Sequence, residues 1–389
     1  MAKPPLDALR AAAHAEPLGI YLHVPFCADR CTYCSFTSTC DQSLKPQVVA
    51  KLIDDLAEWG EALARPAFDT LYLGGGTPSV LTQEELTQLT VRVRGSFDAS
   101  SCREATLEAN PGTADLAWMA GARRLGWDRI SLGIQTLDDD LLRRLGRIHD
   151  GKEGLAALAR AREAGFERIS ADLMIGIPGQ ALARVRADAH RLVEAGATHL
   201  SVYMLDLDKA CPLKSLVDSG ALALPPEEEV ADAYELLLEE LPHLGLTAYE
   251  ISNFAVPGEE SIHNTRYWER RPYLGLGPSA ASHLGTWRWT EDPDIPIWAR
   301  NQGEPELQAL PPAEALAEIP LLGLRMRKGV DWDRLRARAD NGGLRALVDA
   351  WEAELAPFHH LGLLERDGPM LRFTRKGLLL SNRVLEVFV

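Results

Sequence analysis

Residues 23–40, HVPFCADRCTYCSFTSTC, hold four of the six cysteines of a 389-residue chain. Thiols at this density indicate a disulfide framework, a zinc site, a redox pair or an iron–sulfur cluster. Cys27, Cys31 and Cys34 form a C-x3-C-x2-C pattern, and Cys40 follows as a fourth, more distant thiol. The rest of the sequence has to show which of these four kinds of site is present.

The composition is that of a globular protein, with 46% hydrophobic and 25% charged residues. The net charge of −15 argues against nucleic-acid binding, because a surface that follows phosphates needs an excess of Lys and Arg. No apolar run reaches membrane-spanning length, and the N-terminus lacks the apolar region of a secretion signal. We therefore expect a cytoplasmic protein with at most peripheral membrane contact. In that reducing compartment, clustered cysteines bind metal more often than they form disulfides.

Short apolar runs alternate with segments that are apolar at helical spacing, which is typical of parallel strands joined by crossover helices. The pattern predicts an α/β fold, a partial (β/α)6 TIM-like barrel, with an open doubly wound sheet as the alternative. The predicted strands are IYLHV (20–24), TLYLGGG (70–76), EATLEAN (104–110), RISLGIQ (129–135), RISADLMIGIPG (168–179) and THLSVYML (198–205).

The sequence divides into four predicted parts. Residues 1–17 form an N-terminal segment, and residues 18–286 form the barrel with a Gly- and aromatic-rich extension. Residues 287–312 form a connector that carries Pro and Trp. Residues 313–389 are predicted to be a mostly helical, winged-helix-like domain, with a hairpin at LLERDGPMLRFTRKG before the closing helix.

Unusual residues follow the predicted strands at their carboxyl ends, where the chemistry of both candidate folds resides. Cysteines follow the first strand and GGGTPS follows the second, while Glu108, Gln135 and Asp172 belong to the third, fourth and fifth. Asp172 also interrupts an apolar strand, so its charge needs a partner or a ligand. This convergence predicts a single site at one mouth of the barrel.

The spacing of the three cysteines favours an iron–sulfur cluster. A zinc site normally has four ligands in paired knuckles, and the second pair is missing here. Thioredoxin-like exchange would use Cys31 and Cys34 and leave Cys27 without a role. Three thiolates on a tight loop instead suit a [4Fe–4S] cube with one iron open to a ligand. Zinc remains the alternative.

The cysteine pattern, with Tyr33 just before the third thiol, resembles that of the radical S-adenosylmethionine (SAM) superfamily. GGGTP (74–78) resembles the glycine-rich motif of that superfamily, although alone it is also typical of a tight turn. Longer motifs resemble the oxygen-independent coproporphyrinogen III oxidase group, and within it the haem chaperone (HemW) branch. These motifs are YLHVPFCADRCTYCSF, LYLGGGTPSVL, LEANPGT, SLGIQTLDDDLLRRLGRIHD, DLMIGIPGQ, YEISNFA and HNTRYW. The resemblance runs from about Ile20 into the C-terminal part.

The resemblance implies that Cys27, Cys31 and Cys34 ligate a [4Fe–4S] cluster whose fourth iron binds SAM. It implies that Arg147 grips the methionine carboxylate, because a guanidinium pairs with a carboxylate through two hydrogen bonds. Glu108 would accept the ammonium group and Asp172 the ribose hydroxyls. The implied SAM-binding residues are Tyr21, Tyr33, Gly74, Gly75, Gly76, Thr77, Glu108, Gln135, Arg147 and Asp172. Core packing is the alternative for the two tyrosines.

HNTRYW resembles the haem-binding H-N-x-x-Y-W motif of the chaperone branch. It implies His263 as an axial ligand of haem iron, with Tyr267 and Trp268 as apolar walls. A structural hydrogen-bonding role is the alternative for a lone histidine. Phe36 stands where the oxidases have a further cysteine, which points away from decarboxylation. Cys40, Cys102 and Cys211 match no ligand position, and we expect the last two to be structural.

We therefore expect a haem chaperone that binds haem and transfers it to acceptor haemoproteins, on a scaffold with a [4Fe–4S] cluster and SAM. The resemblance leaves a homodimer open. The alternative is a catalytically active radical SAM enzyme that decarboxylates a porphyrin, as a coproporphyrinogen III oxidase does. One segment departs from the family pattern, because YMLDLDKAC has Asp208 and Cys211 where relatives have Glu and Thr.

Overall fold

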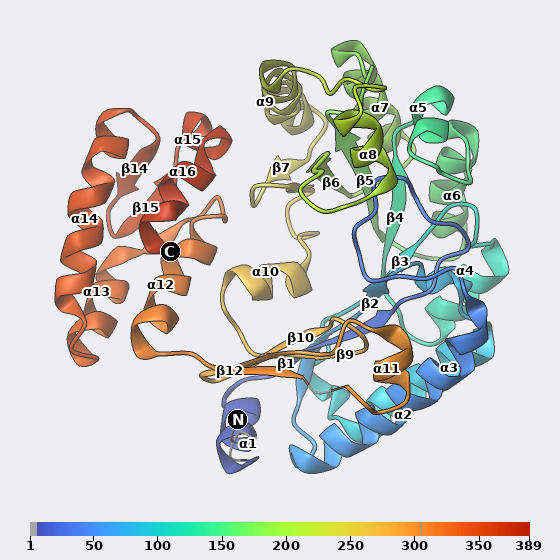
Figure 1. The fold of residues 1–389 in the computed structure, drawn as a ribbon, viewed down its shortest axis with the longest axis horizontal. Coiled ribbons are helices and arrows are strands. Elements are labelled where there is room, and N and C mark those ends of the chain that lie inside the picture. The colour runs from blue at the N-terminus through green and yellow to red at the C-terminus, as the bar shows by residue number, and fades with distance from the viewer. Residues whose placement is uncertain (1–5, 304) are drawn as a thin grey trace.

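The computed structural model describes residues 6–303 and 305–389, so the first five residues of the predicted N-terminal segment lie outside the described residues. Residues Leu6–Ala15 form helix α1 (Figure 1). None of the helices in the described residues is both long and apolar enough to cross a membrane.

Six parallel strands form the centre of the molecule, in the order in which they follow one another along the chain. All six predicted strands, and with them the partial (β/α)6 barrel, are confirmed. Most of their residues are buried, which explains why they read as apolar runs. The strands are β1 (Leu18–Val24), β2 (Phe68–Gly75), β3 (Glu104–Ala109), β4 (Arg129–Gln135), β5 (Arg168–Ile175) and β6 (His199–Met204).

Helices join these strands and cover the outer face of the sheet (Figure 1). Their apolar faces pack on the strands, as expected for crossover connections. They are α2 (Lys45–Ala62), α3 (Gln83–Ser96), α4 (Leu116–Arg124), α5 (Asp139–Arg144), α6 (Gly151–Glu163), α7 (Leu182–Glu194), α8 (Pro212–Asp218) and α9 (Glu227–His243).

The inner face of the sheet is polar. Successive residues of a strand point to opposite faces, so the polar residues at alternate positions share one side. On β5, Asp172 accepts a hydrogen bond from Ser131 of β4 at 3.3 Å, and Ser170 bonds the ring of His199 of β6 at 2.8 Å. Polar side chains therefore face the barrel interior, and aliphatic side chains face the surrounding helices.

Additional strands extend the sheet to twelve. β9 pairs in parallel with β1, and β10, β11 and β12 follow it in antiparallel order, so the predicted connector 287–312 contributes two strands to this sheet. The added elements are β7 (Thr247–Ala248), β8 (Asn253–Ala255), α10 (Ile262–Trp268), β9 (Tyr273–Leu276), β10 (Ala281–Leu284), β11 (Trp287–Thr290), α11 (Ile295–Ala299) and β12 (Glu306–Ala309).

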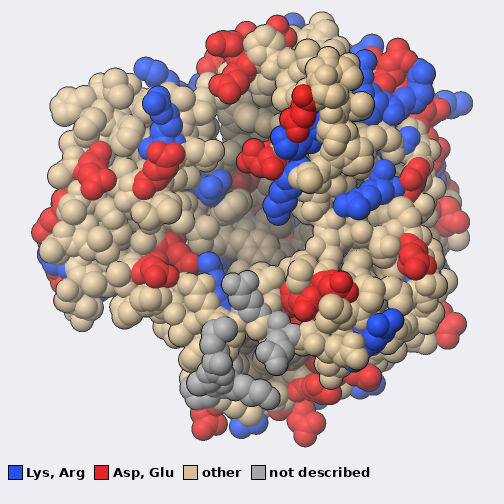
Figure 2. Space-filling model, viewed as in Figure 1, with Lys and Arg blue, Asp and Glu red and all other residues tan. Residues whose placement is uncertain are grey.

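The C-terminal part is mostly helical with a small three-stranded sheet, as predicted. The hairpin predicted at residues 363–377 forms β14 and β15. Backbone bonds such as Ile251 N to Arg325 O, at 3.1 Å, connect this part to the barrel. Its elements are α12 (Pro312–Gly323), β13 (Val330–Asp331), α13 (Trp332–Asn341), α14 (Arg345–His360), β14 (Leu364–Asp367), β15 (Met370–Phe373), α15 (Arg375–Leu379) and α16 (Ser381–Leu385). Figure 2 shows acidic and basic side chains interspersed around a central hollow.

Candidate functional site

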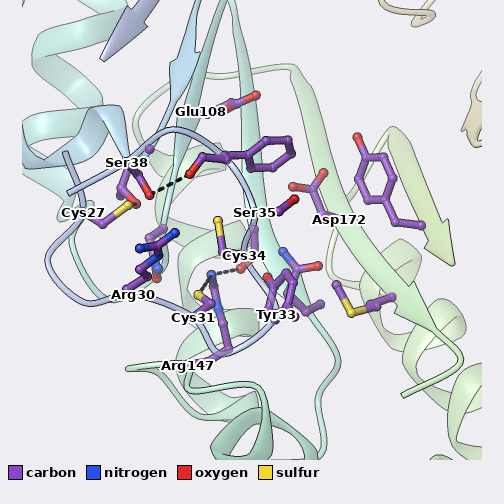
Figure 3. Close-up of a pocket in the computed structure, with 18 of the residues that line it drawn as sticks. Cys27, Arg30, Cys31, Tyr33, Cys34, Ser35, Ser38, Glu108, Arg147 and Asp172 are labelled. Carbon is purple, nitrogen blue, oxygen red and sulfur yellow. Dashed lines mark hydrogen bonds between the residues drawn. The ribbon is translucent and has the colours of Figure 1, made fainter. Parts of the chain in front are cut away.

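A cavity of about 550 Å³ lies at the carboxyl ends of the parallel strands (Figure 3). It brings together residues from five strand ends and the cysteine loop, which are far apart in the sequence. Its size is within the range of pockets that bind cofactors and drug-sized ligands. Of the residues expected at the SAM and cluster site, those that line it are Cys27, Cys31, Tyr33, Cys34, Gly75, Gly76, Thr77, Glu108, Gln135, Arg147 and Asp172.

The cysteine loop is held by backbone bonds and presents three thiols to the cavity. The amide of Cys27 donates to Thr39 O at 3.0 Å, which closes the loop at its base. The Arg147 guanidinium lies 3.2 Å from the Cys31 sulfur, and the Thr77 hydroxyl lies 3.6 Å from the Cys27 sulfur. Donors aimed at sulfur favour the thiolate form that an iron ligand requires. Cys40 is exposed and is not among the lining residues.

Burial raises the pKa of the Cys27 and Cys34 thiols, and a bound metal centre reverses that effect because a coordinating thiol is deprotonated. Among the described residues, His, Cys, Asp and Glu form no group of three arranged around a single metal ion. A [4Fe–4S] cube does not require such convergence, since each thiolate binds a different iron. The donor set in the cavity therefore fits a cluster.

The glycine-rich motif is a backbone surface at the end of β2. Gly75 has a φ of +113°, and a Cβ there would lie 2.8 Å from the His23 ring. A Cβ on Gly76 would lie 2.7 Å from the carbonyl oxygen of Phe26. Both positions require glycine, so the motif is more than a generic turn. Gly74 lies one position earlier and is not among the lining residues.

Two half-buried carboxyl groups, Glu108 on β3 and Asp172 on β5, face the cavity from either side of β4. Glu108 accepts hydrogen bonds from the Tyr72 hydroxyl at 2.8 Å and from the Gly75 amide at 3.2 Å. Burial raises the pKa of Glu108 to about 7 and that of Asp172 to about 6. A ligand cation or hydroxyl group would stabilise either carboxylate, because it offsets the free-energy cost of burying the negative charge.

Arg147 lines the cavity, although its sequence context, RRLGR, resembles an exposed helix end. Its guanidinium donates to Gly133 O and to the Cys31 sulfur (Figure 3). Gln135 adopts a positive φ of +72°, an uncommon conformation for this residue type. Tyr33 packs on a small apolar cluster that includes the buried Cys211.

Tyr21 lies below the cavity, in the barrel interior, and does not line it. Its hydroxyl is 3.0 Å from the Nδ1 atom of His23, and its ring is 6.0 Å from that of Tyr72. The structure thus places this residue against the core, the alternative considered for it.

The HNTRYW segment forms α10, and its histidine is buried inside the barrel. His263 is 1% exposed. Its Nδ1 atom lies 2.8 Å from the Thr70 hydroxyl, and its Nε2 atom lies 2.8 Å from the Tyr267 hydroxyl. Burial lowers the pKa of His263 to about 3, so the ring is neutral. Both ring nitrogens have intramolecular partners, and the ring does not line the cavity.

Sequence reasoning missed the residue that holds α10 in place. Glu104, at the start of β3, is completely buried and accepts from the amides of Ile262 at 2.8 Å and His263 at 3.0 Å. It also pairs with Arg168 at 2.8 Å. A polar residue at the beginning of an apolar strand was the available signal, because it lies on the same inward face as Glu108.

Trp268, the last residue of the motif, faces the C-terminal part. The Arg325 guanidinium lies over its ring, 5.4 Å from the centroid, and the neighbouring Arg270 pairs with Glu318 of α12 at 2.6 Å. α10 therefore connects the barrel interior with the C-terminal helices: of the three residues expected to bind haem, His263 and Tyr267 bond each other, whereas Trp268 faces the C-terminal part.

Large apolar side chains also gather at the mouth of the cavity. Phe36, Tyr203 and Met204 line it and are 67%, 42% and 43% exposed. Phe36 was singled out in the sequence as a departure from the oxidases, whereas the other two were missed because they belong to an ordinary strand pattern.

Comparisons with known proteins agree with this architecture. Residues 21–192 match the radical SAM superfamily, and residues 310–380 match the HemN C-terminal domain. The chain is 33% identical to the Heme chaperone HemW of Bacillus subtilis, over 95% of this chain and 98% of that protein. It is 32% identical to the Heme chaperone HemW of Mycobacterium tuberculosis H37Rv, over 96% and 95%.

One solved structure has nearly the same fold. Coproporphyrinogen III oxidase (HemN) from Escherichia coli superimposes with a TM-score of 0.86 at 22% identity, covering 98% of this chain and 92% of that chain. At this identity the likeness establishes the fold of the barrel and of the C-terminal part.

Proposed function

The chain belongs to the haem chaperone (HemW) family of radical SAM proteins, and on that premise we propose that it binds haem and transfers it to acceptor haemoproteins. The observation that carries the proposal is similarity over almost the whole length to relatives named as haem chaperones. The exposed Phe36, in place of a fourth cysteine, supports it over porphyrin decarboxylation.

The cavity is proposed as the site of a [4Fe–4S] cluster held by Cys27, Cys31 and Cys34, and of SAM. When bound, the cluster supplies a single electron to SAM. Arg147 orients the methionine carboxylate through two parallel donors, and Glu108 holds or releases a proton near neutral pH as it accepts the ammonium group. Asp172 and Gln135 orient the rest of the ligand by hydrogen bonding, with the backbone of residues 75–77 excluding water from one side.

Haem ligation is proposed for His263, and it requires a rearrangement. Iron would have to replace the Tyr267 hydroxyl at Nε2, because that nitrogen is occupied in the resting arrangement. The neutral ring is in the protonation state that binds iron. The proposal therefore makes a prediction of opposite sign for two variants. His263→Gln should weaken haem binding, whereas Tyr267→Phe should strengthen it by removing the competing hydroxyl.

The test titrates haem into anaerobically cluster-reconstituted protein and follows transfer to an apo-globin. Tyr234→Phe is the matched control, since it removes a buried hydroxyl bond, 2.6 Å to Ile251 O, outside both sites. Equal haem spectra in wild type and His263→Gln would exclude His263 as ligand. Absence of transfer to the globin, together with SAM-dependent decarboxylation of coproporphyrinogen, would replace the chaperone function with the enzymatic alternative.

A further inference from the structure

Strand β2 reaches both the cofactor cavity and the buried histidine. Its inward-facing residues are Thr70, Tyr72 and Gly74, because alternate residues share a face. Thr70 bonds the Nδ1 atom of His263, and the amide of Gly75, at the end of the strand, bonds Glu108. One short strand thus contacts the haem motif at its beginning and the cofactor cavity at its end.

Tyr72 occupies the middle of this strand and touches both sites. Its hydroxyl donates to Glu108 Oε1 at 2.8 Å, and its ring centroid lies 5.0 Å from that of His263, with an interplanar angle of 30°. The fit is close, since a Cβ on Gly74 would lie 3.0 Å from both the Glu108 carboxyl and the Tyr72 ring. The Tyr72 ring is thus packed between the Glu108 carboxyl, to which its hydroxyl is bonded, and the His263 ring.

We propose that Tyr72 is a positioning residue that couples ligand binding at Glu108 to the position of His263 and α10. This inference rests on the proposed function, with SAM at Glu108 and haem at His263. SAM fixes the ionised carboxylate, which holds the Tyr72 hydroxyl and keeps its ring against His263. Because haem has to displace α10, SAM and haem oppose each other, and linkage makes the effect reciprocal.

The expected coupling is a haem affinity at least about fivefold lower with SAM bound than without it. Tyr72→Phe keeps the ring and removes the hydroxyl, so it should reduce this ratio toward one while both ligands still bind separately. SAM should also slow amide hydrogen exchange in α10 of the wild type and not of Tyr72→Phe. The exchange measurement needs no haem and no turnover.

A pH profile separates positioning from a general structural effect. The ammonium of SAM pairs with ionised Glu108, and the Tyr72 hydroxyl lowers the pKa of that carboxyl by donating to it. Its removal should move the midpoint of SAM binding to higher pH. The titratable groups that face Glu108 are Tyr21 on β1, Tyr72 on β2, Arg129 on β4, Asp172 on β5, Tyr203 on β6 and Tyr267 on α10.

The experiment uses the full-length, cluster-reconstituted chain as wild type, Tyr72→Phe and the control Tyr234→Phe. Glu108→Gln is a second variant that alters the same hydrogen bond from its other end. Unchanged haem affinity and unchanged α10 exchange on adding SAM to the wild type would overturn the coupling. Full coupling in Tyr72→Phe, or equal loss in Tyr234→Phe, would overturn the role of Tyr72. If SAM protects α10 but haem does not bind, the haem function fails and the positioning role of Tyr72 stands.

Discussion

Replacing His263 by alanine is expected to lower the free energy of unfolding by about 3–5 kcal/mol. The imidazole is buried, and its two nitrogens bond the hydroxyls of Thr70 and Tyr267. Each hydroxyl left without a partner costs about 1–3 kcal/mol, and the space left by the ring adds a cavity term. No other side chain in the described residues bonds either hydroxyl, so little of this loss can be recovered.

Urea unfolding, followed by circular dichroism at constant pH, measures this change through the midpoint and the slope. His190→Ala is the matched control, because His190 is partly exposed and bonds only Glu240, at 3.0 Å. Its expected cost is below about 1 kcal/mol. If His263→Ala also lowered the free energy of unfolding by less than about 1 kcal/mol, the conclusion that its ring is buried and bonded at both nitrogens would be refuted. Such a small cost would also make loss of haem in that variant direct evidence for ligation, which a destabilised variant cannot provide.

Three further outcomes follow from the interior of the barrel. The unfolded chain ionises Glu108 above about pH 4.5, while the folded chain keeps its proton up to about pH 7. The free energy of unfolding should therefore fall by about 3 kcal/mol as the pH rises through this window. In Glu108→Gln, which cannot ionise at this position, the urea midpoint should fall correspondingly less over the same pH range. Gly75→Ala should cost about 2 kcal/mol or more in thermal unfolding and impair SAM binding in equilibrium dialysis, because φ is positive and His23 occupies the space. Glu104→Ala should cost about 3–5 kcal/mol and accelerate amide exchange in α10 selectively; uniform exchange across the chain would contradict its role as the anchor of that helix.

The cavity at the carboxyl ends of the strands could be predicted from the sequence because its parts obey local rules. Apolar runs with helical segments between them fix parallel strands, and the carboxyl ends of parallel strands share one edge. Glu108, Gln135 and Asp172 were therefore expected to meet, and the structure brings all three to one cavity. Arg147 had no such local signal, and only the resemblance to a family indicated it.

The surroundings of His263 could not be predicted in this way. α10 is a short helix within the Gly- and aromatic-rich extension, and it is held by Glu104, which lies 159 positions away in the sequence from His263. The same holds for Thr70, 193 positions away. Pairings over such distances leave no periodic pattern, so only the resemblance to a family favoured His263 as a ligand over a structural hydrogen-bonding role.

Burial of His263 restricts how the HNTRYW segment could bind haem. Thr70, which bonds His263, and Gly75, which lines the cavity, are five positions apart on one strand, which places the two about 17 Å from each other along β2. The layer between them is filled by packed aromatic rings, with Tyr21 and Tyr72 both within 6.5 Å of the His263 ring, centroid to centroid. In the proposed function, haem iron displaces the Tyr267 hydroxyl of α10 from Nε2, and the ring of Tyr267 packs directly against that of His263. Of the two tyrosines, only Tyr72 bonds Glu108, so under the proposed coupling it is the residue through which a change at one site reaches the other.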